Sequence, residues 1–391
     1  MDSVNTLNLP VPLFDRTRDY SWRSARPFAL MLGCSVAICL VLFYQRLDKI
    51  FPLLYAHYLV SYEFGLIKRG LVGEIASLFL AKVNYHHVLF VGLALWLITL
   101  ATYLEVFRRT FTFSRRTFPL LAMILGSPFF FKNFMFSIGY FDILGCLAAL
   151  IAILLPVNLA LPIVMGAIGC VLLLVHHIHL LLYLPTIAFI VITRALAAGP
   201  LTTRFLRVSS AAAIAAAGLF VYLVLYGSVT IPMDAFIDAM RVRADAPERI
   251  VPAVARVWFT DIRYEIAQTT EMLPSNALRF PVYLAVVVIH LPLISYFRQL
   301  IHALKIRRDR ILVRAGLIAI SLGYIPIFVV VFDYSRWVSN WATCMILVMH
   351  TARLLPSFGM APVPLDPRSP RNRLFGWMIT LVPRVGIIKP F

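Results

Sequence analysis

The chain has 391 residues, of which 61% are hydrophobic and only 14% are charged. This composition excludes an ordinary soluble protein and leaves no room for a large soluble domain beside the apolar runs. A formal net charge of +18 would favour nucleic acid as the partner of a soluble protein. In a membrane protein, Lys and Arg are retained on the cytoplasmic side, so here the charge predicts topology and we expect no nucleic-acid partner.

The first apolar run, 28–45, follows a polar N-terminal tail, 1–27, and ends in FYQRLDK (43–49). No small-residue cleavage site lies near its end, so we expect an uncleaved first helix instead of a signal peptide. The five cysteines all fall in apolar segments and have no paired loop spacing. Their pattern therefore indicates neither disulfides nor a zinc site.

The apolar runs predict an all-α fold, a polytopic membrane bundle of about ten transmembrane helices. Eight to eleven spans remain open, because the pairs in 118–156 and 159–193 are crowded. The expected spans are 28–45, 88–107, 118–131, 139–156, 159–176, 178–193, 208–226, 280–297, 311–331 and 338–352.

The distribution of basic residues predicts that both termini are cytoplasmic. With the N-terminus inside, roughly three fifths of all Lys and Arg lie in cytoplasmic segments, mostly short loops. The expected organisation is a cytoplasmic tail (1–27), a transmembrane domain (28–352) and a second cytoplasmic tail (353–391).

Two long segments, 46–87 and 227–279, then lie on the extracytoplasmic side as outer loops. Neither resembles disordered linker, because both contain aromatic residues and helical periodicity. In 71–79 the apolar residues share one helical face, which predicts a helix lying in the membrane interface.

The first outer loop contains SYEFGLIKRGLVGEI (61–75). Its ion pairs are consistent with a simple amphipathic helix, but Glu63 could also act as a general base beside Lys68 and Arg69, which would hold an anionic group. Gly70 and Gly73 allow a sharp turn or a close approach. Asp48, just after the first span, is a second candidate carboxylate.

Two further polar groups fall at the same face. Asp142 begins the fourth span in IGYFDILGCLAAL (138–150), either as a helix-start carboxylate or as an acid facing a cavity. His176, His177 and His179 lie at the turn in LLLVHHIHLLLYLP (172–185). They suit interfacial packing or bonds to a substrate phosphate or carboxylate, and a metal site lacks an identifiable third ligand.

The second outer loop and the last span add two more segments. VWFTDIRYE (257–265) alternates aromatic residues with both charge signs, as in a sugar-binding surface or a solvated loop. In FDYSRWVSNW (332–341), Asp333 and Arg336 are spaced i, i+3 and can form a helix-start ion pair. Alternatively, Arg336 binds phosphate bidentately while Asp333 orients it. All five clusters share the extracytoplasmic face, which favours a site.

This layout resembles the GT-C superfamily of membrane glycosyltransferases over roughly residues 28–300. The resemblance lies in the long first outer loop with its carboxylate, the acid at the outer end of a middle span and the second long outer loop. It implies that Glu63 or Asp48 is the catalytic base and that Asp142 matches the later acid. The chain departs from the family in having no paired Asp-x-Asp or Asp-Glu motif after the first span.

The resemblance also implies the reaction and its partners. A sugar would move from a polyprenyl-phosphate donor to a glycan or lipid acceptor of the cell envelope, with membrane lipids as surroundings. Lys68, Arg69 and Arg336, with the histidines, would stabilise the departing phosphate. No cofactor is assigned and a divalent metal stays open. RGLVGE (69–74) and FDYSRW (332–337) also resemble segments of bacterial membrane proteins, which implies the inner membrane.

Three other classes stay open from the sequence. An O-antigen-type polymerase or ligase would also use lipid-linked glycans and outer-face arginines. A secondary transporter would place polar residues at mid-membrane depth on broken helices, often within inverted repeats. A non-catalytic assembly factor is also compatible with motifs as weak as these.

Overall fold

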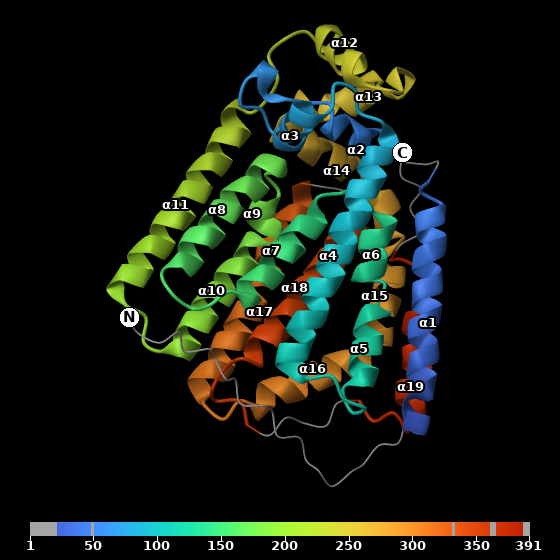
Figure 1. Cartoon of the computed structure of the whole chain (residues 1–391), viewed down its shortest axis with the longest axis vertical. Helices are drawn as coiled ribbons and strands as arrows, with labels where there is room; N and C mark the ends of the chain where they lie inside the picture. Colours follow the sequence, from blue (N-terminus) through green and yellow to red (C-terminus); the bar gives the residue numbers. More distant parts are fainter. Residues whose placement is uncertain (1–21, 48–50, 331–332, 360–364, 386–391) are drawn as a thin grey trace.

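The computed structural model describes residues 22–47, 51–330, 333–359 and 365–385 (Figure 1). Over these residues the fold is all-helical, as the sequence predicts, with nineteen α-helices and three short 3-10 helices. The membrane-bundle helices are α1 (Trp22–Tyr44), α4 (Tyr85–Phe111), α5 (Phe118–Leu125), α6 (Phe131–Phe136), α7 (Asp142–Leu154), α8 (Ala160–Val175), α9 (His179–Leu182), α10 (Leu184–Ala198), α11 (Thr203–Tyr226), α15 (Phe280–Ile289), α16 (Leu291–Ala303), α17 (Arg307–Val330), α18 (Tyr334–Ala352) and α19 (Pro370–Leu381). The remaining elements are α2 (Pro52–His57), η1 (Tyr62–Phe64), α3 (Leu71–Phe79), α12 (Met233–Arg243), η2 (Pro247–Arg249), α13 (Pro252–Ala255), η3 (Arg256–Trp258) and α14 (Ile262–Ala277).

Four of the described helices, α1, α4, α11 and α17, are long and apolar enough to cross a membrane, and a fifth span results if the bent pair α14–α15 is counted as one. The protein is therefore an integral membrane protein. Helix α11 illustrates the membrane surface, because most of its side chains are exposed and many of these, such as Ile214 and Leu225, are large and apolar. Such a helix is stable in contact with lipid, whereas in water its exposed apolar surface would promote aggregation.

Several of the predicted spans contain shorter or broken helices. In the expected span 118–131, α5 ends at Leu125 and α6 begins only at Phe131, because Gly126-Ser127-Pro128 interrupts the helix and proline has no N–H to donate. The expected span 280–297 breaks at His290, and Pro292 lies in the first turn of the next helix, which begins at Leu291. By length and composition, four or five of the described helices or helix pairs qualify as membrane spans. The structure therefore does not show the number of about ten spans that the sequence predicts.

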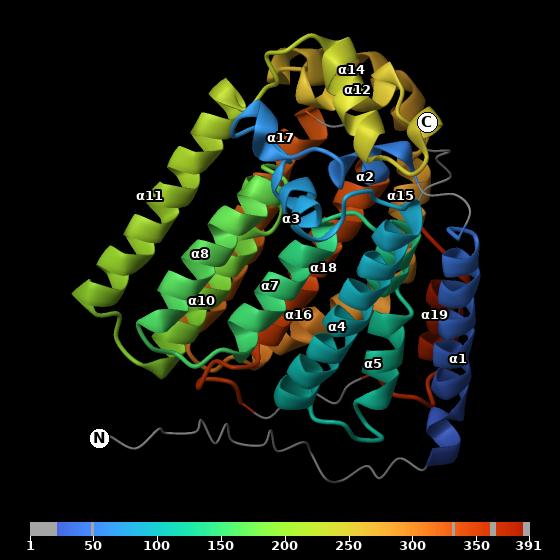
Figure 2. The ribbon, with the colours of Figure 1, turned by 45° about the horizontal axis from the view of Figure 1, so that its top comes forward.

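The two long segments predicted to lie outside the membrane pack together over one end of the bundle. We call residues 51–83 and 228–277 the cap; its helices α2, α3, α12, α13 and α14 lie at the top of Figure 1 and stay there in Figure 2. The Val83 N–H donates to Arg243 O (2.8 Å), and Val83 O accepts from Asp245 N (3.1 Å) and from the Tyr55 hydroxyl (2.6 Å). The predicted interfacial helix over 71–79 coincides with α3.

Two apolar cores hold these layers in place. The larger core fills the bundle between α4, α5, α7, α10, α17 and α18. The second core joins the cap to the bundle, with Trp258 and Tyr55 from the cap packed near Phe141 at the start of α7. Because this second core contains Val88 and Leu89 of α4 and Val175 of α8 together with cap residues, it fixes the position of the cap above the ends of α4, α7 and α8.

Part of the predicted C-terminal tail folds back along the first helix. Helix α19 lies beside α1 in both ribbon views (Figures 1 and 2). A Cβ on Gly376 would approach the Met31 sulfur to 2.8 Å, so the two helices are in close contact. The fully buried Lys132 of α6 donates to the Thr380 and Val382 carbonyls at the end of α19 (2.5 and 3.3 Å). This lysine satisfies carbonyls that a helix C-terminus leaves unpaired.

Candidate functional site

Polar side chains from distant segments meet where the cap covers the bundle. We call this group the cap-facing cluster; its members are His57, Lys68, Arg69, Tyr140, Asp142, His176, His177, His179, Glu265 and Arg336. Most of the sequence-predicted residues are therefore close neighbours in space. Glu63 and Asp48 are not among them.

The centre of the cluster is an ion pair between α18 and α7. Arg336 Nε lies 3.0 Å from Asp142 Oδ2, whereas its Nη1 lies 3.6 Å from Asp333 Oδ2. The Arg336 and Asp142 side chains are only 11% and 2% exposed, and the guanidinium packs 4.4 Å from the Tyr140 ring centroid and 4.1 Å from that of Trp337. The predicted i, i+3 pair exists, but the shorter contact joins Arg336 to another helix.

Asp142 is held in place by a chain of hydrogen bonds. Its Oδ2 accepts from the Asn340 side-chain amide (2.9 Å), and Asn340 Oδ1 accepts from the Tyr183 hydroxyl (2.7 Å). Asn340 lies one helical turn after Arg336 in α18, so the same helix supplies both partners of the carboxylate. These contacts hold Asp142 Oδ2 between Arg336 and Asn340, so the carboxylate is positioned to orient Arg336.

The histidines line the cluster from three elements. His176 follows α8 and His179 begins α9; their ring centroids are 6.4 Å apart. His57, from α2 in the cap, packs against Phe141 and Trp258 at centroid distances of 5.4 and 5.2 Å. Burial, with the charges of Arg69 and Arg336, lowers the pKa of His57 to about 3, so its ring is neutral at ordinary pH.

Several nitrogens in the cluster have no hydrogen-bond partner among the described residues. They include Arg69 Nε and His177 Nδ1. The Leu53 carbonyl is near His57 and the Phe141 carbonyl is near His179, but neither forms a bond of normal geometry, and each ring keeps at least one nitrogen without a protein partner. Buried polar atoms of this kind require water or a ligand.

Lys68 and Arg69 form a cationic turn in the cap. Arg69 has φ +62°, a left-handed conformation that costs a non-glycine residue on the order of 1–3 kcal/mol. The Lys68 N–H donates to Gly227 O (2.8 Å) and its Nζ donates to Thr260 O (2.5 Å), so this turn also joins the two halves of the cap. Burial and Arg69 lower the pKa of Lys68 to about 8, against the opposing charges of Glu265 and Asp261.

The carboxylates near this turn come from the second outer segment. Burial lowers the pKa of Arg69; the Glu265 carboxylate opposes this shift and Arg336 adds to it. Glu265 is half-buried at the start of α14, in the segment 257–265 that the sequence already marks as site-like. Glu63 instead has an exposed side chain in η1, where its charge acts on Arg243. Asp48 lies outside the described residues.

The cluster has no metal-ligand geometry. Within the described ranges, no three His, Cys, Asp or Glu side chains are grouped so that they could hold a metal ion. Positively charged and neutral hydrogen-bond donors dominate around Arg69, which suits an anionic oxygen-rich ligand such as a phosphate.

Sequence reasoning missed His57, Tyr140, Tyr183 and Asn340. Asn340 had a usable signal, because it lies four residues after Arg336 within FDYSRWVSNW. Tyr140 and Tyr183 lie within the quoted segments 138–150 and 172–185, near Asp142 and the histidines, but aromatic residues at span ends are typical of ordinary membrane helices. His57 lies in none of these segments.

Comparisons of the chain with models of known protein families, with curated proteins and with solved structures find no match. The class defined by the fold and the cluster is that of an integral membrane protein with a capped, buried polar site.

Proposed function

We propose that this protein is a GT-C-type membrane glycosyltransferase that takes a sugar from a polyprenyl-phosphate donor. The acceptor is a glycan or lipid of the cell envelope, and the site is the cap-facing cluster on the extracytoplasmic side. The observation that carries the proposal is the group of unpartnered buried nitrogens beside Arg69 and Arg336.

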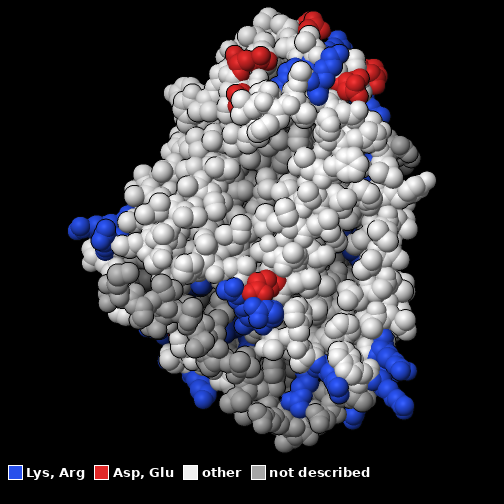
Figure 3. Space-filling model, in the orientation of Figure 1, with Lys and Arg blue, Asp and Glu red and all other residues white. Residues whose placement is uncertain are grey.

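The proposed membrane layout has ten spans, with α5–α6, α9–α10 and α15–α16 each counted as one broken span. The N-terminus is then cytoplasmic, and the membrane is a bacterial inner membrane. Basic residues support this orientation, because Lys and Arg gather on the lower part of the face in Figure 3, away from the cap, while acidic side chains gather mainly at the cap.

In the proposed reaction, the acceptor hydroxyl loses its proton to a carboxylate and its oxygen attacks the anomeric carbon of the donor. The bond from that carbon to the phosphate oxygen breaks, and the lipid phosphate leaves with the electron pair. Arg69 and Arg336 stabilise the leaving charge, while Asp142 orients Arg336. Glu265 is the carboxylate closest to this role, because its charge acts on both Arg69 and Lys68. Glu63 remains the alternative base.

The experiment measures a product that does not depend on the sugar or the acceptor. Purified protein in proteoliposomes is given a panel of radiolabelled polyprenyl-phosphate sugars and an envelope extract, and release of polyprenyl phosphate is followed. Arg336→Gln and Asp142→Asn should each lower the release roughly 100-fold or more, since removing one charge-stabilising group costs about this much in comparable sites.

Arg109→Gln is the matched control, because Arg109 forms an exposed ion pair with Glu105 (2.7 Å) away from the cluster. It should leave the release unchanged. Release of polyprenyl diphosphate from a diphosphate-linked glycan would instead favour a polymerase or ligase. No release from any donor, or equal release by the Arg336→Gln protein, contradicts the proposal.

A secondary transporter is the second candidate, because two broken helices are joined by a polar contact inside the bundle. Ser127, in the break between α5 and α6, lies 2.8 Å from His290 Nε2, in the break between α15 and α16. Transporters place binding groups at such breaks. Substrate-dependent uptake into proteoliposomes that is lost in Ser127→Ala would favour this candidate.

A further inference from the structure

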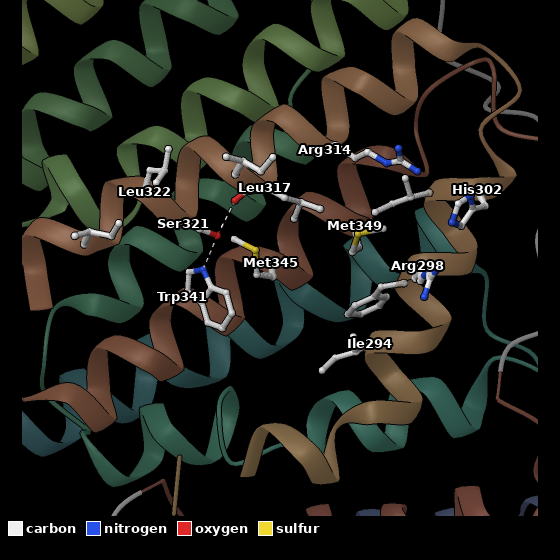
Figure 4. A pocket seen from close by; sticks show the side chains of 14 residues that line it. Ile294, Arg298, His302, Arg314, Leu317, Ser321, Leu322, Trp341, Met345 and Met349 are labelled. Atoms are coloured by element: carbon white, nitrogen blue, oxygen red, sulfur yellow. Dashed lines mark hydrogen bonds between the residues drawn. The ribbon is translucent and has the colours of Figure 1, made fainter. Parts of the chain in front are cut away.

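A groove of about 730 Å³ lies between α16, α17 and α18 and shares no residue with the cap-facing cluster (Figure 4). Its walls are largely apolar, with side chains such as Ile294, Leu317 and Met345. The polar atoms at its inner end are already satisfied, since the Trp341 indole N–H donates to Ser321 Oγ (2.9 Å). The groove therefore suits a hydrocarbon chain.

Three basic side chains, Arg298, His302 and Arg314, lie together at the other end of the groove (Figure 4). All three are exposed, and none forms a side-chain hydrogen bond or ion pair with a residue that the structure describes. They sit near the end of α16 and the beginning of α17, on the side of the bundle away from the cap. Two guanidinium groups and an imidazole at one end of an apolar groove match a phosphate diester attached to an acyl chain, and they disfavour a headgroup that also carries a positive charge.

The length of the groove decides which lipid fits. Arg314 and Ile325 are lining residues eleven positions apart on α17, which corresponds to about 16 Å along a helix. This is roughly half of a ~30 Å hydrocarbon core. An acyl chain that ends at the bilayer midplane matches this length, whereas a polyprenyl chain is much longer than one leaflet.

We propose that this groove binds an anionic phospholipid of the leaflet opposite the cap. The phosphate lies between Arg298 and Arg314 with His302 as a further donor, and an acyl chain follows the groove toward Trp341. This inference is independent of the proposed transfer reaction, because it rests on residues outside the cap-facing cluster.

Native mass spectrometry of the delipidated full chain in detergent tests the site, with phosphatidylglycerol and phosphatidylcholine as matched probes. The wild-type protein should retain phosphatidylglycerol at least about tenfold more tightly. The double variant Arg298→Gln/Arg314→Gln should lose this preference, since each charge-assisted contact contributes about tenfold. Ile294→Trp, which fills the groove, should reduce the binding of both lipids.

Arg204→Gln/Arg207→Gln is the matched control, because it removes two exposed arginines outside the groove. It should keep the preference for phosphatidylglycerol, and circular dichroism should show that each variant retains its helical content. Equal binding of both lipids by the wild-type protein overturns the proposal, as does equal loss in the control, which would indicate attraction to the whole surface. Displacement of phosphatidylglycerol by equimolar polyprenyl phosphate overturns the choice of occupant.

Discussion

Lys68 combines a buried ammonium group with a second cation, Arg69, as its neighbour in the chain. Its side chain is 6% exposed, and burial together with Arg69 lowers its pKa from the usual 10.5 to about 8. The lysine is therefore mostly charged at pH 7 and mostly neutral at pH 9. An anion held in the cluster gains from this charge only in the lower part of that range.

We predict that binding of polyprenyl phosphate weakens as the pH rises from 7 to 9. The phosphate itself, with a second pKa of about 6, stays doubly charged over this range, so the loss reports on Lys68. Lys68→Arg keeps a cation at all these pH values and should remove the dependence. Binding of radiolabelled polyprenyl phosphate to the purified protein at pH 7, 8 and 9 measures the effect.

A loss of folded protein at high pH would not explain the weaker binding. The pKa of Lys68 is lower in the folded than in the unfolded chain, so between about pH 8 and 10.5 the unfolded chain binds more protons. The contribution of this group to stability consequently rises with pH in that window. A fall in binding that is equally steep in the Lys68→Arg protein would contradict the assignment to Lys68.

At the scale of elements, local patterns in the sequence predict helices but not the way in which their ends meet. The apolar face in 71–79 is sufficient to predict α3, and the apolar runs predict the long helices. The break after α5 follows from Pro128, a signal that a hydropathy average over 118–131 conceals. Breaks of this kind explain why ten apolar runs do not give ten uninterrupted helices.

In the cap-facing cluster, only the contacts between residues that are close in the sequence were predictable. Asp333 and Arg336 lie one turn apart, and their pairing follows from helix geometry alone. The contact of Arg336 with Asp142 joins residues that are 194 positions apart, and the effect of Glu265 on Arg69 joins two separate outer segments. A shared membrane face brings such residues within one layer, but the packing of the cap residues Trp258 and Tyr55 on the bundle decides which of them meet.

The contact between α3 and the loop that joins α2 to η1 gives a prediction about the cap. A Cβ on Gly73 would lie 2.0 Å from the Val60 carbonyl oxygen, which belongs to the backbone and cannot rotate away. Gly73→Ala should therefore displace α3 and destabilise the protein by roughly 1–3 kcal/mol. A thermal-stability assay in detergent should show a clear decrease in Tm.

Gly218→Ala is the control for this prediction, since it also adds one methyl group to a helical glycine. No atom lies within 4 Å of a Cβ at Gly218, and alanine favours the helix α11. Its Tm should be equal to or slightly above that of the wild-type protein. Equal Tm values for both variants would show that α3 does not pack against Val60 in solution.

At the scale of the whole molecule, charge separates the two ends of the bundle. The cap contains acidic and basic side chains together, whereas mainly basic side chains lie on the opposite part of the face in Figure 3. Between these regions the surface is largely uncharged, as expected for a belt in contact with lipid. The asymmetry of Lys and Arg predicts that the cap faces away from the cytoplasm.

Labelling of single cysteines provides a direct measurement of this orientation. In a background without the five native cysteines, Asp238→Cys lies in the cap and Arg307→Cys lies at the start of α17; both native side chains are exposed. When the protein is expressed in a bacterial host, a membrane-impermeant maleimide should label Asp238→Cys in intact cells with their outer membrane permeabilised. It should label Arg307→Cys only after the inner membrane is opened. The reverse pattern would place the cap-facing cluster on the cytoplasmic side, where a donor assembled in the cytoplasm reaches it without crossing the membrane. That result would contradict the extracytoplasmic reaction proposed for Arg69 and Arg336.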